Sequence, residues 1–187
     1  MSKKVSRCFG GNPLMDKYHD EEWGVPEHDD TNLFELLILE GAQAGLSWNT
    51  VLQKRENYRE AFDNWDYKKI ARYTADDFER LLENKGIIRN RRKIESAIKN
   101  AKAFIEIQNE FGSFDKYIWS FVDGKPIKNK IRDWSECPSN NPLSDIISKD
   151  LKKKGMNFVG STIIYAYLQA IGIVNDHFTT CFRYDKT

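Results

Sequence analysis

Cysteine and histidine are scarce in this sequence of 187 residues, which contains three of each. An odd number of cysteines and the lack of a recognisable signal peptide argue against a disulfide-rich secreted scaffold. We therefore expect the protein to work in the reducing cytoplasm. Long apolar runs are also missing, and none approaches the roughly 20 residues that a transmembrane helix needs, so no membrane partner is expected.

An excess of charge of one sign is lacking as well. Lysine and arginine number 29 against 28 aspartates and glutamates, so the formal net charge is +1. No overall electrostatic field favours nucleic acid, and any anionic partner must be met by local basic clusters. The chain length suits one unit with a sizeable core, or two small interleaved lobes. The sequence shows no apolar stripe that would form an interface between subunits, so we expect a monomer.

Four of the six cysteines and histidines fall into two pairs far apart in the sequence. Cys8 and His19 form the first pair, separated by what reads as loop, and His177 and Cys181 form the second. On a helix, the spacing of the second pair would place both side chains on one face. Two thiolates and two imidazoles are the ligands of a closed tetrahedral zinc site. We expect a structural zinc that joins the segments 1–30 and 155–187; two buried cysteines with two incidental histidines are the alternative.

Apolar side chains recur at helical spacing along most of the chain and alternate nowhere long enough to build a sheet, so we predict an all-α fold. Candidate N-caps such as Ser47, Thr74 and Asn90 mark where helices begin. The stretch 123–142 contains three prolines and predicts a loop, with room for a brief irregular pair of strands. The predicted helices cover 31–44, 47–62, a segment from 74, a long segment from 90, 114–121, 143–154 and 158–171.

Glu40 shares an apolar row of its predicted helix with Leu36 and Leu37 and lies near the C-terminal end of that helix. Poor solvation and the helix dipole would both raise the pKa of this carboxyl group. Together with Tyr18, Trp23 and Trp48, which are near it in the sequence, Glu40 could form a flat-walled slot for a planar, positively charged heterocycle. The alternatives are a glutamate that reaches water or an arginine, and aromatic side chains that simply fill the core.

A short turn over residues 84–90 separates two predicted helices and is rich in basic side chains. Lys85, Gly86 and Arg89 lie in the turn, and Arg91 opens the helix that follows. Free backbone N–H groups at the start of a helix, with basic residues beside them, suit a phosphodiester backbone. A plain basic turn on the surface is the alternative.

Several motifs in collinear order resemble the type I 3-methyladenine DNA glycosylases, from about Arg7 to Cys181. The resemblance implies a helix-hairpin-helix glycosylase fold, as a single unit over 1–187 with the hairpin region at about 31–112. It also implies a zinc site at the four paired residues, and excision of 3-methyladenine from alkylated double-stranded DNA. The motifs are Tyr18–Pro26, Leu39–Trp48, Lys54–Tyr58, Trp119–Phe121, Phe158–Gly160 and Val174–His177.

The same resemblance assigns expected roles to individual residues. Glu40 matches the carboxylate that recognises the base and is the expected catalytic residue. Tyr18 and Trp48 match aromatic residues that stack on the lesion, and Trp23 matches a further wall of the pocket. The turn with Gly45 and Leu46 matches the loop that is pushed into the duplex, and the 84–90 turn matches the DNA-backbone hairpin. Met15 departs from the pattern, because relatives often have an aromatic residue there; a thioether can still contact a ring.

The chemistry of such a reaction agrees with these residue types. Adenine alkylated at N3 is a cation and leaves without an added proton, so an anionic, aromatic slot can suffice for catalysis. No lysine stands out as a Schiff-base nucleophile, so we expect base removal without strand cleavage. Two alternatives stay open: a helix-hairpin-helix glycosylase of other base specificity, and a zinc-stapled DNA-damage binder that is not an enzyme.

Overall fold

The computed structural model describes residues 6–186, and within that range the chain is mostly helical, as the sequence predicts. None of the helices there has both the length and the apolar character needed to cross a membrane. The helices are α1 (Pro13–Glu21), α2 (Asp30–Gln43), α3 (Trp48–Ala61), the 3-10 turn η1 (Asp63–Trp65), α4 (Tyr67–Ile70), α5 (Ala75–Glu83), α6 (Arg91–Phe111), α7 (Phe114–Ser120), α8 (Pro142–Lys153) and α9 (Ser161–Ala170).

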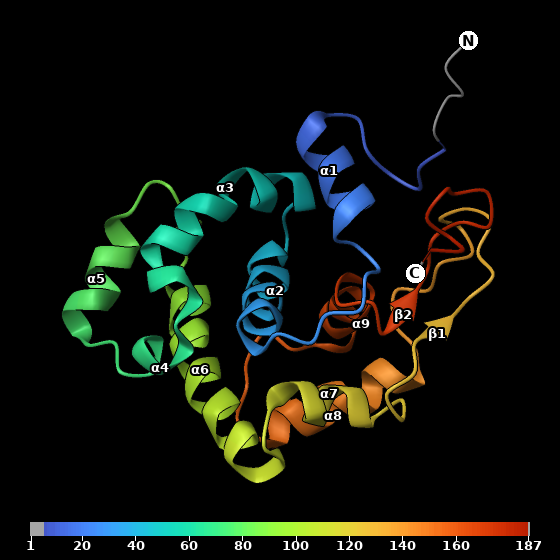
Figure 1. Cartoon of the computed structure of the whole chain (residues 1–187). Coiled ribbons are helices and arrows are strands. Elements are labelled where there is room, and N and C mark those ends of the chain that lie inside the picture. The colour runs from blue at the N-terminus through green and yellow to red at the C-terminus, as the bar shows by residue number, and fades with distance from the viewer. Residues whose placement is uncertain (1–5, 187) are drawn as a thin grey trace.

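Helix α2 lies in the middle of the molecule, where other helices surround it on several sides (Figure 1). It contacts α3, α6, α7 and α9, and every residue from Leu33 to Ala42 is buried. Asp29 begins the helix, because its side chain accepts hydrogen bonds from the free N–H groups of Thr31 and Asn32. Burial on all faces explains why the sequence of this helix is apolar around most of its circumference. Glu40, near its end, is therefore inside the protein.

Helices α5 and α6 are joined by the turn 84–90 at one side of the molecule (Figure 1). The side chain of Asn90 accepts from the N–H of Lys93 and begins α6 where the sequence predicts it. The turn is held against α3, because Lys54 Nζ donates to the carbonyl of Gly86 at 3.2 Å and Asn57 Nδ2 donates to the same oxygen at 3.3 Å. A Cβ at Gly86 would meet Asn57 Cβ at 3.0 Å, so glycine permits this close approach.

The segment between Cys8 and His19 is not the loop that the sequence suggested, because α1 forms there. Asn12 caps this helix and Pro13 occupies its first turn, a combination typical of helix N-termini. His19 is thus presented by a helix rather than by a flexible connection.

His177 and Cys181 do not lie on a helix, the arrangement in which their spacing would place both side chains on one face. Strand β2 (Val174–Asn175) pairs in parallel with β1 (Ile127–Lys128), and the extended backbone continues to an isolated bridge at Phe178 before a turn. This pairing with a distant segment overrides the local spacing signal. It also means that the strand of the 123–142 loop has its partner in the C-terminal segment rather than inside the loop.

Candidate active site and metal cluster

A cavity of about 200 Å³ opens beside the C-terminal half of α2. Side chains of α1, α2, α3 and α9 and of three loops form its walls. Most of these side chains are aromatic or apolar, so the cavity suits a flat organic group. The lining residues are Phe9, Met15, Tyr18, Trp23, Glu40, Gln43, Trp48, Trp134, Ala166 and Gln169. The cavity thus brings together all the residues that the sequence placed in the slot: Glu40, Tyr18, Trp23, Trp48 and Met15.

Glu40 is the one carboxylate in this lining, and it is only 5% exposed. Burial raises the pKa of its carboxyl group from 4.5 to about 8. Burial is the sole cause, since no cation or hydrogen-bond donor within residues 6–186 offsets it. A buried carboxylate without a partner is costly, and a positively charged ligand would relieve that cost.

Tyr18 and Trp48 face each other in the same cavity, with ring centroids 5.2 Å apart and planes tilted by 49°. The Tyr18 hydroxyl and the Trp48 indole N–H are both buried without a hydrogen-bond partner among the residues described. Burial, and secondarily the nearby Glu40, raises the pKa of Tyr18 well above its usual value, so its phenol stays neutral. Two unpaired donors beside an unpaired carboxylate indicate a site built for a polar, planar ligand.

Five wall residues were not anticipated from the sequence: Phe9, Gln43, Trp134, Ala166 and Gln169. Phe9 packs edge-on against Trp23 at 5.1 Å, and Trp134 is 46% exposed at the rim. An aromatic side chain in a proline-rich loop was the only available signal for Trp134. Its place in the wall depends on the pairing of β1 with β2, which local patterns do not encode.

The loop after α2 lies at the edge of the cavity, next to a second hollow of about 220 Å³ that shares Glu40 as a wall. Leu46, in this loop, is 42% exposed, and Gly45 has a φ of +77°. Lys93 of α6 fixes the base of the loop, because its Nζ donates to the carbonyls of Ala42 and Ala44, both at 2.8 Å. Gly45 and Leu46, the predicted wedge residues, therefore follow a segment of backbone that Lys93 holds in place.

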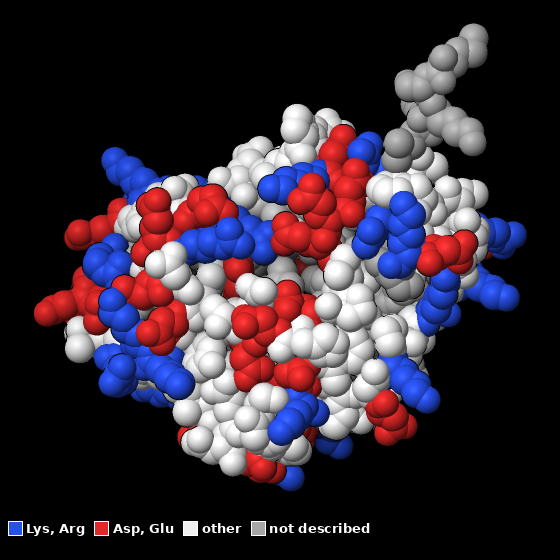
Figure 2. Space-filling model, in the orientation of Figure 1, with Lys and Arg blue, Asp and Glu red and all other residues white. Residues whose placement is uncertain are grey.

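The basic residues predicted to meet DNA are exposed around the α5–α6 turn. Lys85 and Arg89 point to solvent, while Arg91 lies over the ring of Phe78 at 4.7 Å and near Glu79 at 3.7 Å. On the face drawn in Figure 2, acidic and basic side chains are interspersed, in keeping with the small net charge. Attraction to an anionic polymer would thus be local.

Cys8, His19, His177 and Cys181 come together as a buried cluster whose candidate ligand atoms all lie within 4.8 Å of one another. His177 Nδ1 is 3.5 Å from both sulfur atoms, and His19 Nε2 is 3.4 Å from Cys181 Sγ. Ligands at the edges of a tetrahedron around zinc are about 3.5 Å apart. The donor set and the spacing therefore fit a zinc ion.

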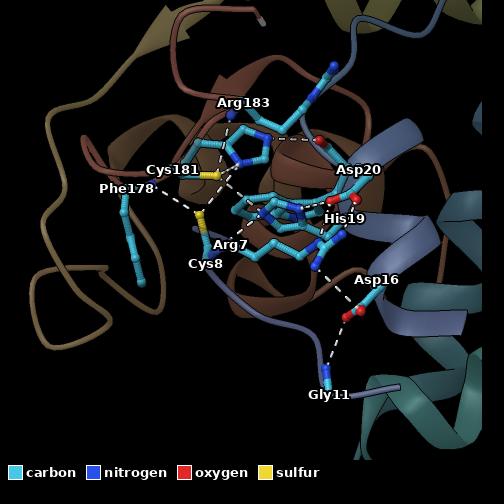
Figure 3. Close-up of polar contacts among 11 residues, drawn as sticks. Arg7, Cys8, Gly11, Asp16, His19, Asp20, Phe178, Cys181 and Arg183 are labelled. Atoms are coloured by element: carbon cyan, nitrogen blue, oxygen red, sulfur yellow. Dashed lines mark hydrogen bonds and ion pairs between the residues drawn. The ribbon is translucent and has the colours of Figure 1, made fainter. Parts of the chain in front are cut away.

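The surroundings of the cluster fit a metal as well (Figure 3). His19 Nδ1 bonds Asp20 at 2.8 Å, and Arg7 in turn donates to Asp20 at 2.6 Å. His177 Nε2 lies 3.1 Å from the carbonyl of Trp23, and the N–H of Phe178 donates to Cys8 Sγ at 3.1 Å. Outer partners of this kind orient the imidazoles of metal sites.

Burial raises the pKa of the Cys8 thiol to about 12 and lowers the pKa of His177 to about 4. The imidazole is therefore neutral and able to act as a ligand, while a thiolate at this depth would need a cation beside it. The third cysteine, Cys137, is not part of the cluster and instead contacts Asp176 and Gln169.

Fold and site together define a helical protein with an aromatic pocket, lined by one buried carboxyl group, and a Cys₂His₂ cluster that joins distant parts of the chain. The family model of methyladenine glycosylases matches residues 8–184. DNA-3-methyladenine glycosylase from Haemophilus influenzae is 48% identical over 179 residues, which cover 95% of this chain and 97% of the relative. DNA-3-methyladenine glycosylase 1 from Escherichia coli is 49% identical over 182 residues, with 96% and 97% covered.

Solved structures agree with the sequence relatives. A crystal structure of 3-methyladenine DNA glycosylase I superposes with a TM-score of 0.92 at 50% identity, covering 95% of this chain and 98% of that one. A variant of 3-methyladenine DNA glycosylase I in complex with 3-methyladenine superposes with a TM-score of 0.91 at 36% identity, covering 94% of each chain. The chain belongs to the methyladenine glycosylase family, as a member of its type I DNA glycosylases.

Proposed function

We propose that the protein removes 3-methyladenine from alkylated double-stranded DNA by hydrolysing the bond between base and sugar, without cutting the strand. The observation that carries this proposal is Glu40: a buried, unpartnered carboxylate in an aromatic cavity. A cationic planar base offers the charge and the shape that this cavity lacks. The activities named for the relatives support the same substrate.

DNA binding begins at the α5–turn–α6 hairpin, which acts as a helix-hairpin-helix element. Lys85, Arg89 and Arg91 supply positive charge, and Gly86 lets the turn that carries them pack closely against α3. Extrusion of the base costs a few kcal/mol and is least costly for a damaged pair. Leu46, exposed at the edge of the cavity, fills the gap that the base leaves.

Inside the cavity, the rings of Tyr18 and Trp48 contact the base, with Trp23 and Met15 completing the walls. Cation–π contact favours a positively charged ring over a neutral one. The charge of the base also returns Glu40 to its ionised form, because an opposite charge lowers the pKa of a carboxyl group. The sugar then acquires oxocarbenium character as the base leaves, and no general acid is required.

Cys8, His19, His177 and Cys181 would hold a zinc ion with all four positions filled by protein. Such an ion contributes folding free energy rather than chemistry. We further propose that the enzyme acts as a monomer of two interleaved helical lobes, which sedimentation in solution would test.

Liquid chromatography of the bases released from DNA treated with a methylating agent tests the proposal. We expect free 3-methyladenine, with the strand intact on a denaturing gel. Release of a different base would favour another glycosylase specificity. Tight binding without release would favour a damage-binding protein and would contradict the proposed reaction.

A further inference from the structure

Gln169, near the end of α9, lines the same cavity as Glu40 but belongs to a separate hydrogen-bond network. Its side-chain Nε2 is 2.7 Å from Asp176 Oδ2 and 3.4 Å from Cys137 Sγ. Gln169 is 8% exposed and Asp176 is 1% exposed. The glutamine side chain therefore spans from the wall of the cavity to a carboxylate buried behind it.

Asp176 is surrounded by donors, which decides which way the amide faces. Tyr165 Oη donates to its Oδ2 at 2.6 Å, and Asn129 Nδ2 donates to its Oδ1 at 2.7 Å. A carboxylate that accepts from several donors cannot donate, so it selects the NH₂ end of the Gln169 amide. Reversing the amide would place two acceptor oxygens in contact.

Cys137 strengthens the same orientation. Burial is the main cause that raises the pKa of its thiol to about 11, so the group is a thiol that donates to Asp176 Oδ2 at 3.6 Å. Its sulfur then accepts the second N–H of Gln169. Both amide hydrogens point to groups behind the wall. No donor within residues 6–186 reaches Gln169 Oε1, and this oxygen is not among the fully buried polar atoms that lack a partner, so it is accessible from the cavity.

We infer that Gln169 is a specificity-determining residue whose Oε1 is a fixed hydrogen-bond acceptor for the exocyclic amino group of the extruded base. The inference rests on the proposed function and deepens it. An acceptor at this wall suits 3-methyladenine, which carries an amino group at position 6. It disfavours 3-methylguanine and 3-methylhypoxanthine, which carry a carbonyl oxygen there and would leave two acceptors facing each other.

Glu40 alone does not provide this discrimination. Its carboxyl group changes between donor and acceptor as it takes up or loses a proton, and its pKa of about 8 places that change near neutral pH. The Gln169 amide does not titrate. A second polar group with a single, enforced role therefore separates amino from oxo bases at every pH.

Free-base binding, measured by quenching of tryptophan fluorescence, tests the inference with 3-methyladenine and 3-methylhypoxanthine as probes. Gln169→Met keeps the length of the side chain and removes the acceptor. We expect the preference for 3-methyladenine over 3-methylhypoxanthine to fall by about five- to twentyfold, the size of one neutral hydrogen bond and its mismatch. Tyr165→Phe is the matched control, because it removes another donor to the same Asp176 oxygen without changing the cavity acceptor; its preference should equal that of the wild type.

An unchanged ratio of affinities in folded Gln169→Met would overturn the inference, and so would an equal loss in Tyr165→Phe. If Gln169→Met does not fold, Asp176→Asn takes its place. That change lets residue 176 donate a hydrogen bond, so the Gln169 amide is free to reverse. The preference for 3-methyladenine over 3-methylhypoxanthine should then fall as well. A wild-type preference in Asp176→Asn would also overturn the inference. Failure of the wild type to release 3-methyladenine from DNA is a different result, which would contradict the proposed function itself.

Discussion

Glu40 makes the protein without a ligand less stable as the pH rises. Burial raises the pKa of its carboxyl group from 4.5 to about 8 in the folded state, so between these values the folded chain holds a proton that the unfolded chain has released. The contribution to stability is complete below about pH 4.5 and is lost as the pH climbs towards 8. The residue proposed to bind the base is thus retained at a cost to folding.

Glu40→Gln should separate these two roles. We expect the free energy of unfolding of the variant to exceed that of the wild type by an amount that grows with pH, by up to about 1.4 kcal/mol for each pH unit between 4.5 and 8. Release of 3-methyladenine in a single turnover should fall about a hundredfold, as when one preorganised electrostatic group is lost.

Urea unfolding at pH 5 and pH 8, beside single-turnover chromatography, measures both effects. Glu21→Gln is the matched control, because Glu21 is exposed on α1 and should change neither quantity. A stability difference that does not vary with pH would refute the assignment of the raised pKa to Glu40.

For individual residues, the sequence allowed prediction only of those features that depend on neighbours along the chain. Glu40 could be predicted as buried because its helical row contains leucines, and its aromatic neighbours lie close in the chain. Gln169 and Trp134 could not be predicted as wall residues, since they reach the cavity only through contacts between distant segments. The orientation of the Gln169 amide depends on Asp176, a relation visible only in three dimensions.

Among the elements, α6 connects the hairpin to the loop that carries Leu46. Lys93 makes this connection, since its ammonium group caps two carbonyls at the end of α2. Burial lowers the pKa of Lys93, yet the group remains a donor to both oxygens. A link of this kind would keep Leu46, the proposed wedge, at a fixed distance from the turn proposed to bind phosphate.

Lys93→Met should weaken that link. We expect a loss of about 1–3 kcal/mol in the free energy of unfolding, because two partly buried carbonyls lose a charged donor. Extrusion of the base should slow as well. The fluorescence of 2-aminopurine placed opposite or beside the lesion measures its rate. Arg92→Met changes the neighbouring exposed residue and should leave both measurements near wild type; equal effects in the two variants would argue against a specific role for Lys93.

The hairpin can be tested through the salt dependence of DNA binding. Arg89→Gln should reduce the slope of log affinity against log salt by about one and should weaken binding similarly for all sequences. Lys152→Gln, an exposed change on α8, is the control. An unchanged slope in Arg89→Gln would remove this residue from the phosphate contacts.

The helices that the sequence predicted best are those with a strong local beginning. Asn90 and Ser47 cap α6 and α3 at the positions expected. The short α1 was overlooked because nine residues give little periodicity, although Asn12 and Pro13 carried a start signal. The pairing of β1 with β2 is non-local, and it replaced the helix that the spacing of His177 and Cys181 had favoured.

For the whole molecule, the Cys₂His₂ cluster connects the first and last parts of the described chain. Cys8→Ser and Cys181→Ser should each lose zinc and lower the melting temperature, because metal-binding free energy contributes to folding. Cys137→Ser is the control, since Cys137 lies outside the cluster, and it should keep one zinc per chain by elemental analysis. A chelator should have the effect of the two ligand variants; full zinc loss with an unchanged melting temperature would contradict the structural role.

The same cluster has a consequence for how the protein is made. Its last sulfur belongs to Cys181, while the aromatic walls at Phe9, Tyr18 and Trp23 come from the beginning of the chain. During translation the first pair of ligands, Cys8 and His19, is made together with those rings, and the second pair follows only after every helix of the fold. The cluster, and the folding free energy of an ion bound there, therefore cannot contribute before residues 177 and 181 have been made.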